Sequence, residues 1–324
     1  MQKPTQNKTW RGKTGGTKGM QETLIRMFRH IDTRVVAPFV VCWVLGYLLG
    51  MRAERRASWH YWRRHQGARP LAACVAVWRQ FYAMSHVVLD RFAAYAGQNF
   101  QILTDDPAGV MGRLQHSEKG FVILSSHVGN QELAGYFTHS EKPLHILIYL
   151  GDTPTVNRER ERLFEANKLQ FLPMEADGSH IFEMHQVLER GEALSIHGDR
   201  LFSDSRSLRT AFLGAEAAFP EGPFRVAALE RVPVVTMFML RTGHKRYELR
   251  IRELSRPVDE TLNNKQLAQA LLSRYAHEME LALADYPEQW FNFFEFWTEE
   301  PAERQLHNGT VEIQADGKKA TEQI

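Results

Sequence analysis

The stretch that decides the fold is FVILSSHVGNQE, residues 121–132. Its apolar half, FVILSS (121–126), shows no polar alternation, which predicts a strand buried on both faces, as in a parallel sheet. The polar half predicts a turn and then a helix that begins at Gln131, with Asn130 as its N-cap. His127 therefore follows directly after a buried strand, and α/β sheets bind their ligands at such carboxyl ends.

Short apolar runs of the same kind recur downstream, with helix-like stretches between most of them. They are LHILIYL (144–150), LQFLPM (169–174), ALSIH (193–197) and VPVVTMFML (232–240). YELRIREL (247–254) alternates and is expected to form an edge strand, and residues 264–285 an amphipathic helix. The sequence thus predicts an α/β fold with a mostly parallel central sheet flanked by helices.

Residues 21–97 are expected to be helical throughout and to associate with a membrane. Residues 35–51, VVAPFVVCWVLGYLLGM, carry no charge, but a full span needs about 20 apolar residues. A shallow or re-entrant insertion, a tilted span and a buried core helix are the alternatives. The following AERRASWHYWRRH (53–65) mixes arginine with tryptophan, which is typical of a lipid headgroup interface.

Composition sets the remaining limits on the class of protein. The chain is 44% hydrophobic with a net charge of +2, which excludes a disordered chain. Two cysteines, Cys42 and Cys74, allow no disulfide framework; they indicate a reducing compartment and are expected to be buried. We divide the chain into a basic flexible N-terminus (1–20), a membrane-associating region (21–97), an α/β domain (98–300) and a polar tail (301–324).

His127 and Glu132 are the first candidates for catalysis. On one continuous helix an offset of five places two side chains about 140° apart, so the pair meets only if His127 lies in the turn and Glu132 in the first helical turn. A neutral imidazole with a pKa near about 6.5 is the usual general base, and a carboxylate behind it fixes its tautomer. Alone, this spacing is weak evidence, because a structural histidine is the commoner outcome.

A second polar block, SIHGDR (195–200), ends another buried strand. Arg200 is expected to clamp a phosphate or to stabilise developing negative charge, and a local salt bridge with Asp199 is the alternative. His127, His197 and Asp199 also suggest a metal site, but no HExxH motif or cysteine pair supports it. We expect no metal and no cofactor.

The order of these motifs resembles the lysophospholipid acyltransferase superfamily. Within it, the chain is most similar to the lipid A biosynthesis (lauroyl/myristoyl-type) acyltransferases and to related acyltransferases of lipid and aryl-polyene pathways. The resemblance covers residues 10–297 and rests on SSHVGNQE (125–132), HGDR (197–200), GPFRVAALERVPVV (222–235) and PEQW (287–290). It implies a glycerol-phosphate acyltransferase-like fold, with His127 as base and Glu132 as its carboxylate.

The same resemblance offers two positions for the third family block. Residues 219–222 spell FPEG, the core of that block in the glycerol-phosphate acyltransferase relatives. Because we expect no strand before FPEG, we place Asp199 and Arg200 in the site and treat Glu221 as a turn residue. Glycerol phosphate is then not the expected acceptor.

The resemblance implies direct acyl transfer from an acyl carrier protein or coenzyme A thioester to a hydroxyl or amine of a lipid or polyene-type acceptor. Backbone amides of the turn, with Arg200, are expected to hold the oxyanion. Nucleic acid is not an expected partner, and the expected location is the cytoplasmic face of the bacterial inner membrane, peripheral or single-pass. The residues expected to bind substrate are Ser126, Asn130, His197, Asp199, Arg200 and Arg158.

Three rival functions remain open from the sequence. The first is a thioesterase or lipid hydrolase that uses the same site, with water in place of the acceptor. The second is a non-catalytic, membrane-associated pathway partner. The third is a metal-dependent hydrolase.

Overall fold

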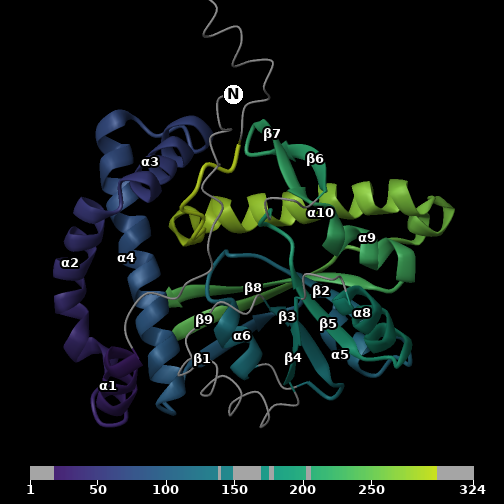
Figure 1. Ribbon diagram of the computed structural model, residues 1–324, viewed down its shortest axis with the longest axis horizontal. Helices are drawn as coiled ribbons and strands as arrows, with labels where there is room; N and C mark the ends of the chain where they lie inside the picture. The colour runs from purple at the N-terminus through teal and green to yellow at the C-terminus, as the bar shows by residue number, and fades with distance from the viewer. Residues whose placement is uncertain (1–17, 138–139, 149–168, 175–178, 202–205, 298–324) are drawn as a thin grey trace, which may run out of the picture.

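The computed structural model describes residues 18–137, 140–148, 169–174, 179–201 and 206–297 (Figure 1). Its centre is a seven-stranded sheet in the order β1-β9-β8-β2-β5-β3-β4. The strands are β1 (Gln101–Asp105), β2 (Phe121–Ser125), β3 (Leu144–Ile148), β4 (Leu169–Pro173), β5 (Ala193–His197), β8 (Val234–Gly243) and β9 (Arg246–Glu253). Arg158 lies outside the described residues, as does the tail from 301 onward.

The middle of the sheet is parallel, as the unbroken apolar runs predict. β2 is buried at every position and pairs in parallel with both β5 and β8. β3 continues the parallel order towards β4. The α/β prediction is therefore confirmed, and the strand that ends before His127 is the central one.

The other end of the sheet differs from the prediction. β9 pairs antiparallel with β8 and parallel with β1, so β9 is an interior strand and β1 forms the edge. The alternation in β9 has another cause: Tyr247, Leu249 and Ile251 are buried, while the residues between them are partly exposed. One face of this strand packs on the core and the other face is partly exposed. The alternation of apolar and polar residues therefore indicates this difference between the faces, and it does not indicate whether the strand lies at the edge of the sheet.

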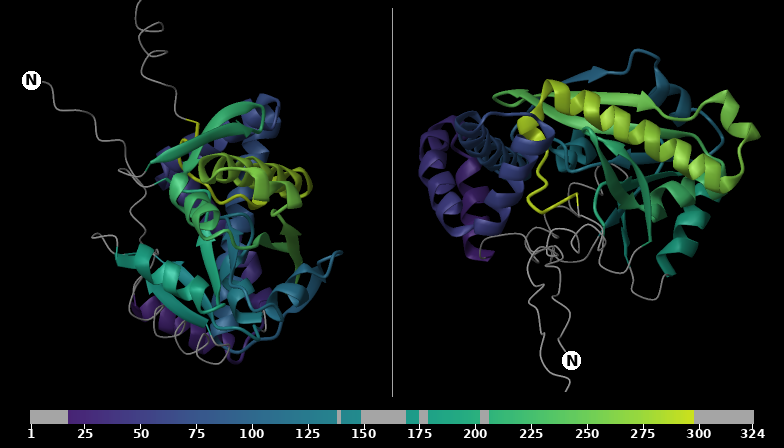
Figure 2. Two further views of the ribbon diagram at one scale, coloured as in Figure 1. Left: turned by 90° about the vertical axis from the view of Figure 1, so that its right-hand side faces the viewer. Right: turned by 90° about the horizontal axis from the view of Figure 1, so that it is seen from above.

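Helices and a small hairpin surround the sheet. α10 runs across the face that also carries the β6–β7 hairpin, and α9 packs against α10 (Figures 1 and 2). These elements are α5 (Val110–Gln115), α6 (Gln131–Phe137), α8 (Ser179–Glu189), β6 (Ser207–Phe212), β7 (Ala215–Pro220), α9 (Glu221–Glu230), α10 (Asn264–Asp285) and the 3₁₀ turns η2 (Pro257–Thr261) and η3 (Pro287–Gln289).

The N-terminal helices stack together at one side of the sheet, on the left in Figure 1. They are α1 (Lys18–Phe28), α2 (Thr33–Gly50), α3 (Arg52–His60), the π-helical turn η1 (Tyr61–His65) and α4 (Pro70–Tyr95). α4 contacts α1, α2, α3 and α6. It therefore links the other N-terminal helices to α6 of the α/β domain.

α2 turns most of its apolar surface outward. It buries one stripe at helical spacing (Thr33, Val36, Val40 and Val44) and packs on α4. It is long and apolar enough to cross a membrane, yet only 22% of it is buried. This low burial argues against the ordinary core helix that the sequence left open. Its outward face carries exposed apolar side chains at Val35, Phe39, Trp43, Leu45, Tyr47 and Leu49.

Two sequence expectations about burial and strands are wrong. Cys42 and Cys74 are both exposed. They lie on the outward faces of α2 and α4, and these faces are apolar, so apolar neighbours in the sequence did not mean burial. In addition, a strand does precede FPEG, because β7 ends at Pro220. β7 pairs with β6 in a separate two-stranded sheet, and its alternating small residues gave little strand signal.

Candidate active site

The central strand delivers His127 to a tight turn beside the end of β5. Ser125 and His197 are register partners on the two strands. Beyond them, the carbonyl of Ser125 accepts hydrogen bonds from Gly198 N–H at 2.9 Å and from the Tyr275 hydroxyl at 2.8 Å. These bonds hold the two strand ends together, so that the residues after them face each other.

Asp199 is the carboxylate that holds His127. Its Oδ1 lies 2.8 Å from Nδ1 of the imidazole, and its Oδ2 accepts the backbone N–H of His127 at 2.8 Å. The indole N–H of Trp290 donates to the same Oδ2 at 3.4 Å. The Asp199 side chain is 1% exposed and the imidazole 26%, so the acid is sealed in the protein while the base reaches the surface.

The electrostatics of this pair suit a general base at neutral pH. Burial lowers the pKa of His127, Arg200 lowers it further, and Asp199 acts in the opposite direction. The imidazole is therefore neutral near pH 7. Burial alone would raise the pKa of Asp199, but the electrostatic interaction and hydrogen bond with the His127 ring, together with the charge of Arg200, hold it well below its ordinary value. Asp199 therefore stays ionised.

Arg200 and His197 complete the polar group around the imidazole. Burial lowers the pKa of Arg200 to about 10, against the effect of Asp199, so the guanidinium keeps its charge at neutral pH. Its Nη2 donates to the carbonyl of Phe291 at 3.0 Å. The rings of His127 and His197 lie 4.7 Å apart between centroids. The SIHGDR block thus meets the His127 turn, as the sequence predicted.

The backbone amides of the turn are already engaged within the protein. His127 N–H donates to Asp199, and Val128 N–H to Ser126 Oγ at 3.1 Å. Gly129 and Asn130 donate to the carbonyls of Gln289 and Met239, at 2.8 and 2.7 Å. The expectation that these amides hold an oxyanion is therefore wrong for residues 127–130, because folding uses their protons to fix the turn.

Glu132 lies in the first turn of α6, where the sequence placed it, and its carboxylate is tied to α4. It accepts from Arg91 Nη1 at 3.2 Å and from the hydroxyl of Tyr95. The Glu132 and Arg91 side chains are 15% and 17% exposed. This carboxylate therefore anchors the start of α6 to α4. A catalytic role for Glu132 stays a prediction.

Asn130 caps α6 and joins a buried network with α4. Its Oδ1 accepts from Leu133 N–H at 3.4 Å, and its Nδ2 donates to the Tyr247 hydroxyl at 3.3 Å. Tyr247 in turn donates to Asp90 at 2.7 Å, which also binds Arg241 at 2.9 Å. Asp90 is 1% exposed. The polar groups of Asn130 therefore hold the turn in place, and its binding to substrate stays a prediction.

The comparison with known families covers this whole region. Residues 110–299 match the model of the bacterial lipid A biosynthesis acyltransferases, which is more than half of the chain. The chain belongs to this family. Among curated proteins, no match to the chain was found. Membership makes the protein an acyltransferase that acts in lipid biosynthesis on a lipid-like acceptor, as the motif order predicted.

The family match begins after the N-terminal helices, yet α4 reaches the site of this lipid A acyltransferase family member. Asp90, Arg91 and Tyr95 all contact the segment that follows His127, directly or through Tyr247. Sequence reasoning missed these three residues. The available signal was a pair of adjacent charges, Asp90-Arg91, inside the apolar stretch VVLDRF (87–92), since buried charges need partners.

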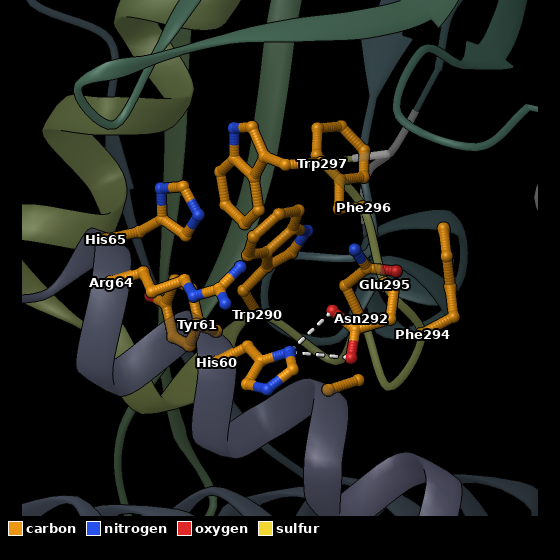
Figure 3. Close-up of a pocket in the computed structure, with 11 residues that line it drawn as sticks. His60, Tyr61, Arg64, His65, Trp290, Asn292, Phe294, Glu295, Phe296 and Trp297 are labelled. Carbon is orange, nitrogen blue, oxygen red and sulfur yellow. Dashed lines mark hydrogen bonds and ion pairs between the residues drawn. The ribbon is translucent and has the colours of Figure 1, made fainter. Parts of the chain in front are cut away.

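The aromatic segment that follows η3 joins the N-terminal helices to the same site. The ring of Trp290 packs edge-on against Tyr61 of η1, 5.3 Å between centroids, while its N–H contacts Asp199. Figure 3 shows His60 pointing at the carboxylate of Glu295, 2.9 Å away. A hollow lined by residues of α3, η1 and the aromatic segment has a cavity volume of about 20 Å³. This volume suits one water molecule rather than a substrate.

The metal interpretation gains no support from the geometry. Among the residues that the structure describes, no group of three or more His, Cys, Asp and Glu side chains is arranged to hold a metal ion. His127 and Asp199 are instead joined directly to each other by two hydrogen bonds.

Proposed function

We propose that this acyltransferase moves a fatty acyl group directly from the thioester of an acyl carrier protein or of coenzyme A to a hydroxyl or amine of a membrane lipid or lipid-like acceptor. The observation that carries the proposal is the pairing of His127 Nδ1 with the sealed carboxylate of Asp199. With Nδ1 protonated and donating to Asp199, Nε2 carries the lone pair that accepts a proton.

The reaction needs one base and one site for negative charge. Nε2 of His127 takes the proton of the acceptor O–H or N–H while the new C–O or C–N bond forms at the thioester carbon. The C–S bond then breaks, and the thiolate takes the proton from the imidazolium. Arg200, charged and within the same polar group, stabilises the oxyanion. General base catalysis contributes roughly 10²–10⁴-fold.

Glu132 serves the same reaction in a different place. Its bonds to Arg91 and Tyr95 fix the first turn of α6 and hence the segment that carries His127. We therefore assign the orientation of the imidazole to Asp199 and the anchoring of the turn to Glu132. Ser126, Asn130 and His197 line or support the same turn, and Arg158 remains a residue predicted from sequence.

Access to a lipid acceptor comes through the N-terminal helices. The outward face of α2 is apolar and exposed, while its inward stripe is packed on α4, which is itself tied to the α/β domain. A helix fixed in this way suits a peripheral protein that lies on the bilayer with one face immersed. We place the protein at the cytoplasmic face of the inner membrane, where acyl carrier protein and coenzyme A thioesters occur.

Product analysis separates this proposal from the hydrolase and the non-catalytic partner. Purified protein is incubated with an acyl-thioester donor and a bacterial membrane lipid extract, and the products are analysed by mass spectrometry. We expect a lipid heavier by one acyl group, with little free fatty acid. Free fatty acid as the main product would identify a thioesterase, and an unconsumed donor would favour a non-catalytic partner.

A further inference from the structure

A second hollow, of about 390 Å³, lies on the side of α4 between the end of β8 and η3. Its lining comes from three elements that are far apart in the sequence, and it includes none of the residues assigned to the reaction. The lining residues used below are Trp78, Arg79, Tyr82, His86, Arg241 and Glu288. Its volume falls within the range of about 300–1,000 Å³ typical of small-molecule sites.

The hollow is lined by a cation, Arg79, and a carboxylate, Glu288, which form only a long ion pair. Arg79 Nη2 and Glu288 Oε1 are 4.0 Å apart, and the two side chains are 63% and 26% exposed. Arg241 is paired with the buried Asp90 below it. Burial, aided by Arg241, lowers the pKa of His86 to about 4, so this imidazole is neutral at pH 7. The hollow therefore suits a ligand that carries both signs of charge.

Three ring systems supply further contacts. Trp78 and Tyr82 stack with centroids 5.0 Å apart, and Tyr82 meets His86 edge-on at 4.5 Å. In the described part of the chain, none of these three side chains makes a hydrogen bond. They offer donors, acceptors and ring faces to a ligand, and the faces of Trp and Tyr attract a cation.

The hollow lies on the same face of α4 as two exposed apolar side chains, and their use here rests on the membrane docking proposed above. Leu71 and Val75 of α4 are 84% and 59% exposed. Steps of three or four residues lead from Val75 to Arg79 and Tyr82, which places all of them along one face of the helix. A lipid whose chains cover Leu71 and Val75 can therefore place its headgroup in the hollow.

From these observations we infer that the hollow binds the phosphoethanolamine headgroup of a membrane glycerophospholipid. Arg79 receives the phosphate as a charge-assisted hydrogen-bond donor. Glu288 accepts a hydrogen bond from the primary ammonium group, which also lies against Trp78 and Tyr82. A quaternary ammonium has no N–H to donate, so phosphatidylcholine fills the same volume without the bond to Glu288.

Vesicle binding tests this inference without altering net charge. One set of vesicles contains phosphatidylcholine and a fixed share of phosphatidylglycerol; in the other, half of the phosphatidylcholine is replaced by phosphatidylethanolamine. We expect the full-length protein to bind the second set about tenfold more tightly or better, the scale of one hydrogen bond to a charged group. Equal affinity for the two sets would overturn the inference.

Variants separate the headgroup site from general effects of the lipid on bilayer packing. Glu288→Gln should lose the preference and still bind the phosphatidylcholine vesicles as the wild type does, whereas Trp78→Ala, which removes a ring that contacts either ammonium group, should weaken binding to both sets of vesicles. Arg69→Gln removes an exposed cation at the start of α4, outside the hollow, and should keep the preference. A preference that survives Glu288→Gln would assign it to bilayer packing and contradict the proposed site.

A soluble probe distinguishes a membrane lipid from a free phosphoester. Glycerophosphoethanolamine is titrated into the protein by calorimetry in the absence of vesicles. We expect much weaker binding than to vesicles, because Leu71 and Val75 then contact no acyl chain. Binding as tight as that to vesicles would show that the occupant is a soluble compound and would overturn the assignment to a membrane lipid.

Discussion

The carboxylate of Asp199 binds His127 twice, through Nδ1 of the imidazole and through the backbone N–H, each at 2.8 Å. One bond fixes the tautomer of the ring and the other fixes the backbone that carries it. Because Asp199 follows β5 and His127 follows β2, neighbouring strands supply the two halves of the pair. Residues 72 positions apart in the sequence are thus joined by the topology of the sheet.

Asp199→Asn tests the orienting role. An amide can present its N–H to Nδ1 and thereby favour the tautomer with its proton on Nε2, which cannot act as a base. We expect kcat to fall by roughly 10³–10⁴-fold, as for the corresponding change in a Ser-His-Asp triad, with a smaller effect on KM. Steady-state kinetics with a thioester donor measure it. A fall of less than about tenfold would show that Asp199 does not orient the base.

Glu132→Gln tests the anchoring role of the other carboxylate. The change weakens the contact with Arg91 in a mostly buried place, so we expect the free energy of unfolding to fall by about 1–3 kcal/mol. Activity should fall less than in Asp199→Asn. Urea unfolding and kinetics on the same preparations measure both quantities. An unchanged stability with a larger loss of kcat than in Asp199→Asn would instead support the catalytic role that the sequence predicted.

The pH dependence of kcat/KM reports the neighbours of His127. A general base acts as the neutral imidazole, so activity is lost as the pH falls through its pKa. Because burial and Arg200 lower that pKa from 6.5, the acid limb should lie below pH 6.5 in the wild type. In Arg200→Gln the cation is gone and the limb should move to higher pH, whatever the change in rate. An acid limb at the same pH in Arg200→Gln would show that Arg200 does not lower the pKa of His127.

Gly129→Ala tests the geometry of the turn. Gly129 has a φ of +74°, and an added Cβ would lie 2.1 Å from the carbonyl oxygen of Met239. We expect a loss of about 2–4 kcal/mol in stability, together with activity, since the turn must open. Gly112→Ala is the matched control: its Cβ meets nothing within 4 Å, and it should be neutral or stabilising. Equal melting temperatures for the two variants would contradict the described turn.

Membrane docking by α2 is tested with two equally exposed aromatics. Phe39 on α2 is 62% exposed and Phe182 on α8 is 63% exposed. Phe39→Glu should weaken vesicle binding strongly and leave the free energy of unfolding within about 0.5 kcal/mol. Phe182→Glu should change neither quantity. Sedimentation with vesicles measures binding, and equal effects of the two variants would refute docking through α2.

The sequence predicted the parts of the fold that depend on local pattern. The apolar runs that form β2 and β5 are buried on both faces, and their unbroken apolar pattern predicted strands. The helical spacing of apolar residues likewise predicted α4 and α10. The interior position of β9 and the hairpin before FPEG were beyond prediction, because strand order depends on long-range pairing. The exposure of Cys42 could not be predicted either, because the sequence of an apolar helix does not indicate whether its apolar face packs on protein or on lipid.

The site was predicted in its residues more than in its pairings. His127, Asp199 and Arg200 meet as expected, because they follow adjacent parallel strands. The sequence spacing could not predict which carboxylate binds the His127 ring. Glu132 is close to His127 in the sequence, whereas Asp199 is close to it only in the folded structure. Nor could the sequence indicate that folding engages the amide protons of residues 127–130, because their acceptors lie on β8, on η3 and in side chains.

Turnover of a thioester donor by His127→Ala measures the central claim most directly. The variant should show no acyl transfer above background, while its circular dichroism spectrum and vesicle binding match those of the wild type. That combination assigns the chemistry to the imidazole. Near-normal transfer by a folded His127→Ala protein would contradict the general-base role and, with it, the proposed mechanism.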